Sequence, residues 1–168
     1  MELRQVAASE PRVRDFLIEH GSAVVARRGE LVDALTRPAV AAFDGGAVAG
    51  VLVYDIAGVE CEILALYAAR QWAGVGTAMV TLVAGLAAAA GCRRYWVLTT
   101  NDNVDALRFY QRRGFRLAAL RCGAVDESRR TLKPQIPPTG EHGIAIRDEI
   151  ELARELSPPP ANPVFPVS

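Results

Sequence analysis

Three apolar segments joined by short glycine turns, between residues 38 and 69, most constrain how this chain can fold. The first two flank the sequence Asp44-Gly45-Gly46, and the third follows a turn at Gly58. Apolar runs separated by a few residues that include glycine are typical of β-hairpins. The segment therefore predicts three consecutive strands connected by tight turns.

A glycine turn followed by an amphipathic pattern comes directly after the third predicted strand. The turn, QWAGVGTAMV at residues 71–80, carries Gly74 and Gly76, and apolar residues then recur at spacings of three and four as far as Gly91. This periodicity predicts a helix over residues 74–90. Glycines allow a backbone to approach a ligand closely, and the first N–H groups of a helix have no partner within it. The turn therefore predicts an anion-binding site.

The rest of the chain predicts further strands and helices around this unit. The predicted elements are a strand at 2–6, a helix after Ser9 that ends at Gly21, a strand at YWVLTT, a helix from Asn103 to Gly114, a strand at FRLAALRC and a last strand at 144–156. Residues 22–36 fit both a strand and a helix. The mixture predicts one α+β domain over residues 1–156, followed by a proline-rich tail at 157–168 that holds five of the ten prolines.

Composition argues against several classes of function. The 19 basic and 19 acidic residues cancel and are interspersed, so we predict no nucleic-acid partner. No run approaches the roughly 18 apolar residues of a membrane span, and the N-terminus lacks a charged segment followed by an apolar one. We therefore expect a cytoplasmic protein without a membrane partner. The three cysteines are far apart and form no CxxC pattern, so neither a disulfide framework nor a metal site is predicted.

Two common phosphate-binding loops do not fit the turn. A P-loop ends in Gly-Lys-Ser/Thr, whereas Gly76 is followed by Thr77 and Ala78. A dinucleotide-binding turn needs a third glycine or alanine where Met79 stands, and only Asp102 after the next strand favours it. A Rossmann-like nucleotide-binding protein therefore stays a weak alternative. A helix cap in which the glycines serve only the backbone geometry is another.

Three segments of the chain resemble the GNAT superfamily of N-acyltransferases. Residues 71–76, Gln-x-x-Gly-x-Gly, are similar to the superfamily's signature for the acetyl-CoA pyrophosphate. Residues 103–115, Asn-x-x-Ala-x-x-Phe-Tyr-x-x-x-Gly-Phe, are similar to its second cofactor-binding segment, and residues 62–67, Glu-Ile-x-x-Leu-Tyr, resemble its fourth strand. The order of the predicted elements from residue 2 to 152 also follows the superfamily's plan.

The resemblance implies a three-layer fold with a mixed, mostly antiparallel central sheet, flanked by helices and splayed between its fourth and fifth strands. It implies that acetyl-CoA is the co-substrate, with its pyrophosphate on the glycine turn and its pantetheine arm along the fourth strand. The cofactor-binding residues implied are Leu66, Tyr67, Ala68, Gln71, Trp72, Ala73, Gly74, Val75, Gly76, Thr77, Ala78, Asn103, Ala106 and Tyr110. An asparagine at position 103 is equally suited to capping the helix.

The resemblance further implies acetyl transfer to a primary amine of a small molecule or peptide, in a ternary complex and without a metal. Tyr110 matches the superfamily's general acid, and Glu62 stands where some members hold a general base. Glu60 lies two residues before Glu62, so both side chains are expected on the same face of the strand. In the alternative interpretation, both carboxylates are solvent-exposed strand residues without a catalytic role. A lysine-like amine loses its proton at pH 7 at a cost of about 4.6 kcal/mol, so a side chain or a water chain must accept that proton.

Other features leave the acceptor and the assembly open. The proline-rich segment from Lys133 to Gly143, which includes His142, is expected beside the acceptor cleft, although such a loop can also simply cover a sheet edge. A homodimer is possible. An acyl-CoA-binding sensor with little turnover is the main alternative to an enzyme.

Overall fold

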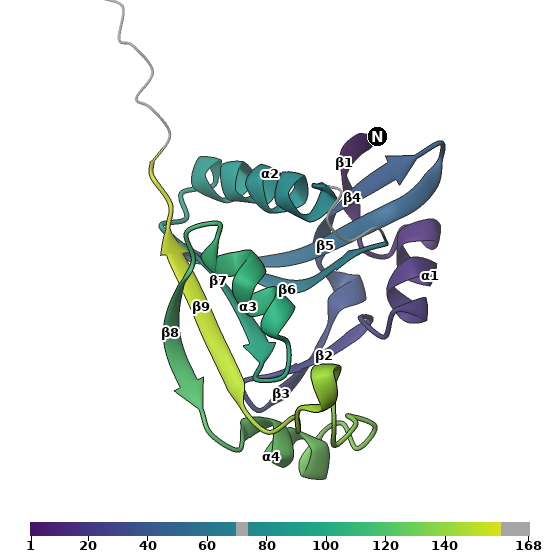
Figure 1. Cartoon of the computed structure of the whole chain (residues 1–168). Helices are drawn as coiled ribbons and strands as arrows, with labels where there is room; N and C mark the ends of the chain where they lie inside the picture. Colours follow the sequence, from purple (N-terminus) through teal and green to yellow (C-terminus); the bar gives the residue numbers. More distant parts are fainter. Residues whose placement is uncertain (70–73, 159–168) are drawn as a thin grey trace, which may run out of the picture.

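The computed structural model of the protein describes residues 1–69 and 74–158 (Figure 1). The strands are β1 Glu2–Ala7, β2 Val24–Arg27, β3 Glu30–Asp33, β4 Pro38–Asp44, β5 Ala47–Ala57, β6 Glu60–Ala68, β7 Arg94–Thr100, β8 Arg116–Arg121 and β9 Glu149–Glu155. The α-helices are α1 Pro11–Glu19, α2 Val75–Ala89, α3 Val104–Gln111 and α4 Ala124–Thr131, and short 3-10 turns lie at Ala34–Thr36 and Glu141–Gly143.

One large sheet organises the molecule. Its strand order is β1-β4-β5-β6-β7-β9-β8, while β2 and β3 form a separate hairpin. Every neighbouring pair in the large sheet is antiparallel except β6 and β7, which are parallel. The predicted mixed, mostly antiparallel sheet flanked by helices is therefore confirmed.

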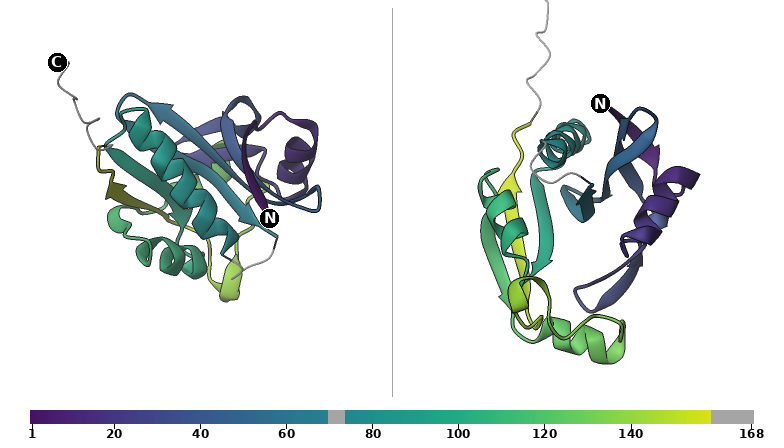
Figure 2. Two further views of the ribbon diagram at one scale, coloured as in Figure 1. Left: turned by 90° about the horizontal axis from the view of Figure 1, so that it is seen from above. Right: turned by 45° about the vertical axis from the view of Figure 1, so that its right-hand side comes forward.

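The sheet is open between β6 and β7, the fourth and fifth strands of the large sheet in chain order. Their pairing runs only from Glu60 with Arg94 to Ile63 with Val97, although both strands continue beyond these residues. At the same level the β5–β6 register shifts, so that Tyr54 faces Ile63 but Val53 faces Ala65. Such a bulge bends a strand. The end of β6 therefore diverges from β7, and the two halves of the molecule separate as in Figure 2.

Both faces of the sheet carry an apolar core. Val40, Leu52 and Ile63 pack with α2 and α3 on one face, and Val51 and Val53 pack with α1 on the other. Because β4 and β5 are covered on both faces, their residues are apolar at nearly every position instead of alternating. The three layers position the N-terminus of α2 and the whole of α3 beside the opening in the sheet.

The ambiguous residues 22–36 form the β2–β3 hairpin and the first 3-10 turn. Arg27 pairs with Glu30 across a two-residue turn in which Arg28 has φ +48° and Gly29 has φ +76°. Two consecutive positive φ angles are the pattern of a type I′ hairpin turn, and glycine is favoured in its second position. The Arg-Gly pair is thus the local cause of the hairpin.

Two expectations about local structure were wrong, and one helix was not predicted. The N-cap of α1 is Glu10, whose carboxylate accepts from the Val13 N–H at 3.0 Å, and not Ser9. Helix α4 was not predicted at all. The last strand begins at Glu149, because the residues before it are used to hold α4: the Val125 N–H donates to the Arg147 carbonyl at 2.9 Å.

The limits of the domain stay a prediction. The described residues end at 158, three residues beyond β9, so most of the tail predicted at 157–168 lies outside them. Among the described residues, no helix has the length and apolar character needed to cross a membrane.

Candidate functional site

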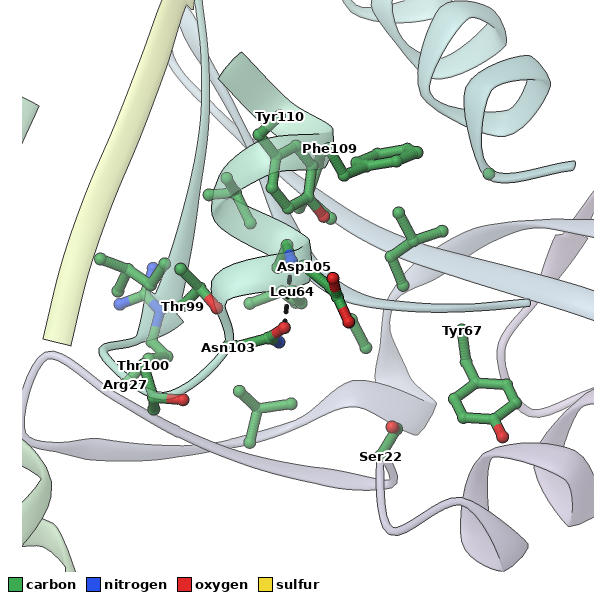
Figure 3. Close-up of a pocket in the computed structure, with 18 of the residues that line it drawn as sticks. Ser22, Arg27, Leu64, Tyr67, Thr99, Thr100, Asn103, Asp105, Phe109 and Tyr110 are labelled. Atoms are coloured by element: carbon green, nitrogen blue, oxygen red, sulfur yellow. Dashed lines mark hydrogen bonds between the residues drawn. The ribbon is translucent and has the colours of Figure 1, made fainter. Parts of the chain in front are cut away.

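A cleft of about 980 Å³ follows the opening between β6 and β7 (Figure 3). One wall is the end of β6 with the N-terminus of α2, and the other is the end of β7 with α3. The cleft continues to the opposite face of the sheet, where β2 and the segment after α4 line it. Its volume is at the upper end of those of ligand pockets, so it can hold an extended molecule.

The backbone N–H groups at the N-terminus of α2 lie at this cleft. Gly74 is the N-cap, in the left-handed conformation with φ +79°, and as a glycine it has no side chain that could cap the helix. The residues that follow, Val75, Gly76 and Thr77, also line the cleft. The first N–H groups of a helix have no partner within it and attract anions. This helix start can therefore receive an anion, and the predicted anion site stays a prediction.

Gly76 lies in close contact with α3. A Cβ atom added at this position would lie 3.3 Å from two carbons of the Phe109 ring, closer than most Cβ contacts. The glycine thus lets the aromatic ring of α3 approach the first turn of α2.

A guanidinium group lies beside this turn. Arg113 donates from Nε to Thr77 Oγ1 at 3.0 Å and from Nη1 to the Phe109 carbonyl at 2.7 Å, and it stacks 3.6 Å from the Phe109 ring centroid. Burial and the neighbouring Arg112 lower its pKa, but an arginine stays charged at any physiological pH. Arg108 and Arg112 line the same end of the cleft. Sequence analysis missed this basic end, although the Arg112-Arg113 pair inside the second motif was its signal.

The end of β6 offers a free strand edge. Leu66, Tyr67 and Ala68 pair with β5 on one side, lie beyond the last pairing with β7, and line the cleft. An extended ligand can add to such an edge as a further strand. The Tyr67 ring packs 3.8 Å from the His20 ring centroid, which fixes this wall against α1. All three predicted β6 residues therefore lie at the cleft.

Tyr110 is buried and lines the cleft from α3. Its ring packs edge-on against Phe109 and Phe115, and no described residue forms a hydrogen bond with its hydroxyl group. Figure 3 shows the Tyr110 ring beside that of Phe109, over the same cavity. Burial raises the pKa of Tyr110 and the charge of Arg113 only partly opposes this, so the hydroxyl keeps its proton at neutral pH.

Asn103 and Ala106 lie together at the start of α3, and both line the cleft. Asn103 Oδ1 accepts from the Ala106 N–H at 3.1 Å (Figure 3). The capping role is therefore observed. A contact of Asn103 with a ligand stays a prediction.

Glu62 is a buried carboxylate held by Arg27 from the β2–β3 hairpin. Arg27 Nε donates to Glu62 Oε1 at 2.8 Å, and Arg27 Nη2 donates to the other oxygen. Burial raises the pKa of Glu62, while its hydrogen bond and ion pair with Arg27 act in the opposite direction. Both residues line the cleft. Glu60 is half-exposed, pairs with Arg94 at 3.0 Å and is not among the residues that line the cleft.

A second ion-pair group fastens the hairpin to the same face of the sheet. Arg28 and Arg121 each donate to Glu151, at 2.7 and 2.8 Å, and Arg94 also binds this carboxylate. The Arg28 guanidinium stacks 4.0 Å from the Trp96 ring centroid. Burial raises the pKa of Glu151, but the three arginines outweigh it and bring the pKa to about 2. The two arginines at the hairpin turn thus hold it over the sheet.

The predicted segment from Lys133 to Gly143 also reaches the cleft. Lys133 and Glu141 line it, and Lys133 Nζ donates to the Val24 carbonyl at 2.9 Å, which joins this segment to the hairpin.

Asp105, Glu141 and His142 bring possible ligand atoms within 4.8 Å of one another, a spacing that a metal ion could bridge. The expectation of a metal-free site stays a prediction.

Three of the predicted cofactor-binding residues cannot be located. Gln71, Trp72 and Ala73 lie outside the described residues. Their proposed contacts stay predictions.

An opened mixed sheet with a helix N-terminus at the opening agrees with what the resemblance to N-acyltransferases implies. The chain belongs to the GNAT acetyltransferase family, because residues 7–115 match the family model described as "Acetyltransferase (GNAT) family". It is 46% identical over 113 residues to the uncharacterised protein YdhI of Bacillus subtilis (strain 168), an alignment that covers 67% of this chain and 70% of YdhI. YxbD of the same strain, also uncharacterised, is 36% identical over the same shares of the two chains.

Solved structures share the fold. An "IAA acetyltransferase" from Bacillus cereus ATCC 14579 superposes with a TM-score of 0.72 at 24% identity, covering 92% of this chain and 99% of that one. A GNAT family acetyltransferase from Elizabethkingia anophelis, solved with acetyl-CoA bound, superposes with a TM-score of 0.67 at 20% identity, covering 92% and 97%. At these identities the likeness is evidence of a common fold.

Proposed function

We propose that the protein transfers the acetyl group of acetyl-CoA to a primary amine by direct attack in a ternary complex. One observation carries the proposal: a single cleft runs from the N-terminus of α2, through the opening in the sheet, to the face under the hairpin. Such a cleft can receive the cofactor from one side and the amine from the other. Membership of the GNAT family and the acetyl-CoA in a structure of the same fold support this proposal.

In this proposal, the first turn of α2 and the arginines beside it hold the cofactor's pyrophosphate. The helix dipole alone supplies about 0.3–1 kcal/mol at an exposed site, whereas each hydrogen bond to a charged group supplies about 1.5–3 kcal/mol. Several converging N–H groups and Arg113 therefore contribute most of the affinity. The pantetheine arm lies along the free edge of β6 at residues 66–68 and brings the thioester into the opening.

The chemical step breaks the bond between the acetyl carbon and the CoA sulfur. The amine nitrogen attacks the carbonyl carbon, the sulfur leaves with the electron pair, and Tyr110 donates its hydroxyl proton to the sulfur. A thiol has a pKa near 8.5, so the thiolate is already a moderately good leaving group. General acid catalysis by Tyr110 therefore enhances the rate at the low end of about 10²–10⁴-fold. The amine must lose one proton in the same sequence.

Glu62 accepts the amine's proton through a water molecule. Arg27 donates to both carboxylate oxygens, but a carboxylate has about four acceptor positions, so at least one is left for water. Burial raises the pKa of Glu62, which makes its carboxylate a stronger base than an exposed glutamate. Glu60 has no such role in the proposal, because it does not line the cleft.

Replacing Glu62 with glutamine is expected to lower kcat most near neutral pH. Part of the loss should be recovered as the pH rises, since more of the amine then arrives without its proton. In the unaltered protein, kcat should fall on the acid side as Glu62 becomes protonated, at a higher pH than for an exposed glutamate because burial raises its pKa. The measurement is kcat against pH for both proteins.

Glu60→Gln is the matched comparison, because it changes a carboxylate of the same strand outside the cleft. We expect its kcat to stay within about twofold of the unaltered protein, as for most surface changes. A Glu62→Gln loss that is equal at every pH would show that Glu62 positions the substrate instead of accepting a proton.

A thiol-release screen tests the proposed function itself. Acetyl-CoA is incubated with the protein and with amines, aminoglycosides, amino acids or peptides, and the acetylated product is identified by mass spectrometry. The proposal expects thiol release that depends on at least one amine. Tight binding of acetyl-CoA without transfer to any of these acceptors would favour the sensor function instead.

A further inference from the structure

Besides Glu62, a second buried glutamate lines the cleft, and it has no close partner among the described residues. Glu149, the first residue of β9, is 7% exposed and borders the cleft on the face covered by the hairpin. Its carboxylate has two contacts at 3.4 Å, one from Arg121 Nη1 and one from the backbone N–H of Arg28. Hydrogen bonds between nitrogen and oxygen are usually 2.7–3.2 Å long, so both contacts are weak.

The other buried glutamates of this face differ in this respect. Arg27 donates to both oxygens of Glu62, and three arginines bind Glu151. Buried carboxylates are nearly always paired at close distance, because an ion removed from water loses its hydration. Glu149 is therefore the buried carboxylate on this face whose bonding capacity is least used.

The neighbouring cations are already engaged elsewhere. Arg121 forms its closer bond, at 2.8 Å, with Glu151. Lys133, which lines the same end of the cleft, donates to the Val24 carbonyl. Both cations therefore form their closest bonds elsewhere, and the Glu149 carboxylate keeps acceptor positions that a cation entering the cleft can bind.

The surroundings of Glu149 suit a short carbon chain that ends in a charge. Val125, Ile136 and Ile146 line the cleft on this side and offer apolar contact. Glu149 pairs with Thr100 at the end of β7, the strand that borders the opening. Neighbouring strands are about 4.8 Å apart, so Glu149 lies roughly 5–10 Å from the opening.

We propose that Glu149 binds a second positively charged group of the acceptor, so that the protein prefers short diamines to monoamines. The inference rests on the proposed function, since it names the class of amine that the same cleft accepts. The reacting amine lies in the sheet opening near the thioester, and the other ammonium group donates hydrogen bonds to the Glu149 carboxylate in place of its two weak contacts.

The test compares diaminobutane with butylamine, which has the same carbon chain and one amine fewer. In the unaltered protein, KM for diaminobutane should be about 10- to 100-fold lower, the range of a hydrogen-bonded charge pair. Glu149→Gln should abolish this preference and change kcat by less than about threefold. Glu155→Gln, an exposed carboxylate of the same strand, should keep the preference. An equal KM for the two amines in the unaltered protein would overturn the proposal, as would a Glu149→Gln protein that keeps the preference.

A binding measurement separates this inference from the proposed function. Calorimetry with CoA-saturated protein should give a Kd for diaminobutane that Glu149→Gln raises about 10- to 100-fold and that Glu149→Asp, which keeps the charge, raises less. If Glu149→Gln does not fold, the comparison rests on Glu149→Asp, which should weaken diaminobutane binding and leave butylamine binding unchanged. Equal weakening for the two amines, or none, would overturn the proposal. Selective diamine binding without any acetyl transfer would instead support the Glu149 site and contradict the proposed function.

Discussion

Gly76→Glu is expected to abolish acetyl-CoA binding while the protein stays folded. The added Cβ atom would lie 3.3 Å from the Phe109 ring, so the ring must shift by a few tenths of an ångström, and the carboxylate beyond it adds a negative charge to the turn proposed for the pyrophosphate. Like charges placed together cost several kcal/mol, which corresponds to a loss of affinity of about 100-fold or more. The measurement is the Kd for acetyl-CoA by calorimetry, with thermal unfolding to establish that the variant is folded.

Gly85→Glu provides the matched control on the same helix. Gly85 is exposed, and nothing lies within 4 Å of a Cβ atom added there. This variant carries the same extra charge away from the cleft, so we expect a Kd within about twofold of the unaltered protein. Unchanged affinity in Gly76→Glu would mean that the cofactor does not bind at this turn.

Tyr110→Phe, which removes only a hydroxyl group, is expected to lower kcat about 100-fold with little change in the Kd for acetyl-CoA. The loss follows if the hydroxyl donates a proton to the departing sulfur, because general acid catalysis enhances rates about 10²–10⁴-fold. The expected value is at the low end, because a thiolate leaves more readily without protonation than a more basic leaving group. The loss should be smaller for acyl donors whose thiol has a lower pKa. Steady-state kinetics with two such donors on one verified acceptor measures both effects.

Tyr95→Phe controls for the loss of a buried tyrosine hydroxyl. Tyr95 is fully buried, donates to the Val80 carbonyl at 3.3 Å and is not among the residues that line the cleft. This variant should keep kcat within about twofold and lose at most about 1 kcal/mol of stability. A Tyr110→Phe protein with the same kcat as Tyr95→Phe would remove Tyr110 from the proposed mechanism.

The sequence predicted the parts of the fold that depend on local patterns. The glycine turns define the β4–β5–β6 strands, and the apolar periodicity defines α2 within one residue at each end. Helix α4 was missed because its pattern is weak: Val125 and Ser128 are its only buried residues among those described. The hairpin at residues 24–33 was ambiguous because its fixed position depends on ion pairs with β6 and β9, far away in the sequence.

The candidate site also has a part that local sequence patterns predicted and a part that depends on contacts between distant residues. Family motifs predicted the α2 turn, the β6 edge and Tyr110, and the described members of these groups, except Ala78, line one cleft. Arg27 and Glu149 were missed because their partners are distant in sequence: Arg27 binds a residue 35 positions away, and the Glu149 carboxylate contacts the backbone of a residue 121 positions away. Spacing along the chain carries no signal for such contacts.

Thermal unfolding with acetyl-CoA or NAD tests the central claim, that this cleft binds acetyl-CoA, most directly. At about 100 times its Kd, a ligand that binds only the folded protein stabilises it by about 2.7 kcal/mol, which raises Tm by about 5–10 °C in a chain of this length. We predict such a rise with acetyl-CoA and none with NAD. A rise with NAD and none with acetyl-CoA would contradict the assignment of the cleft.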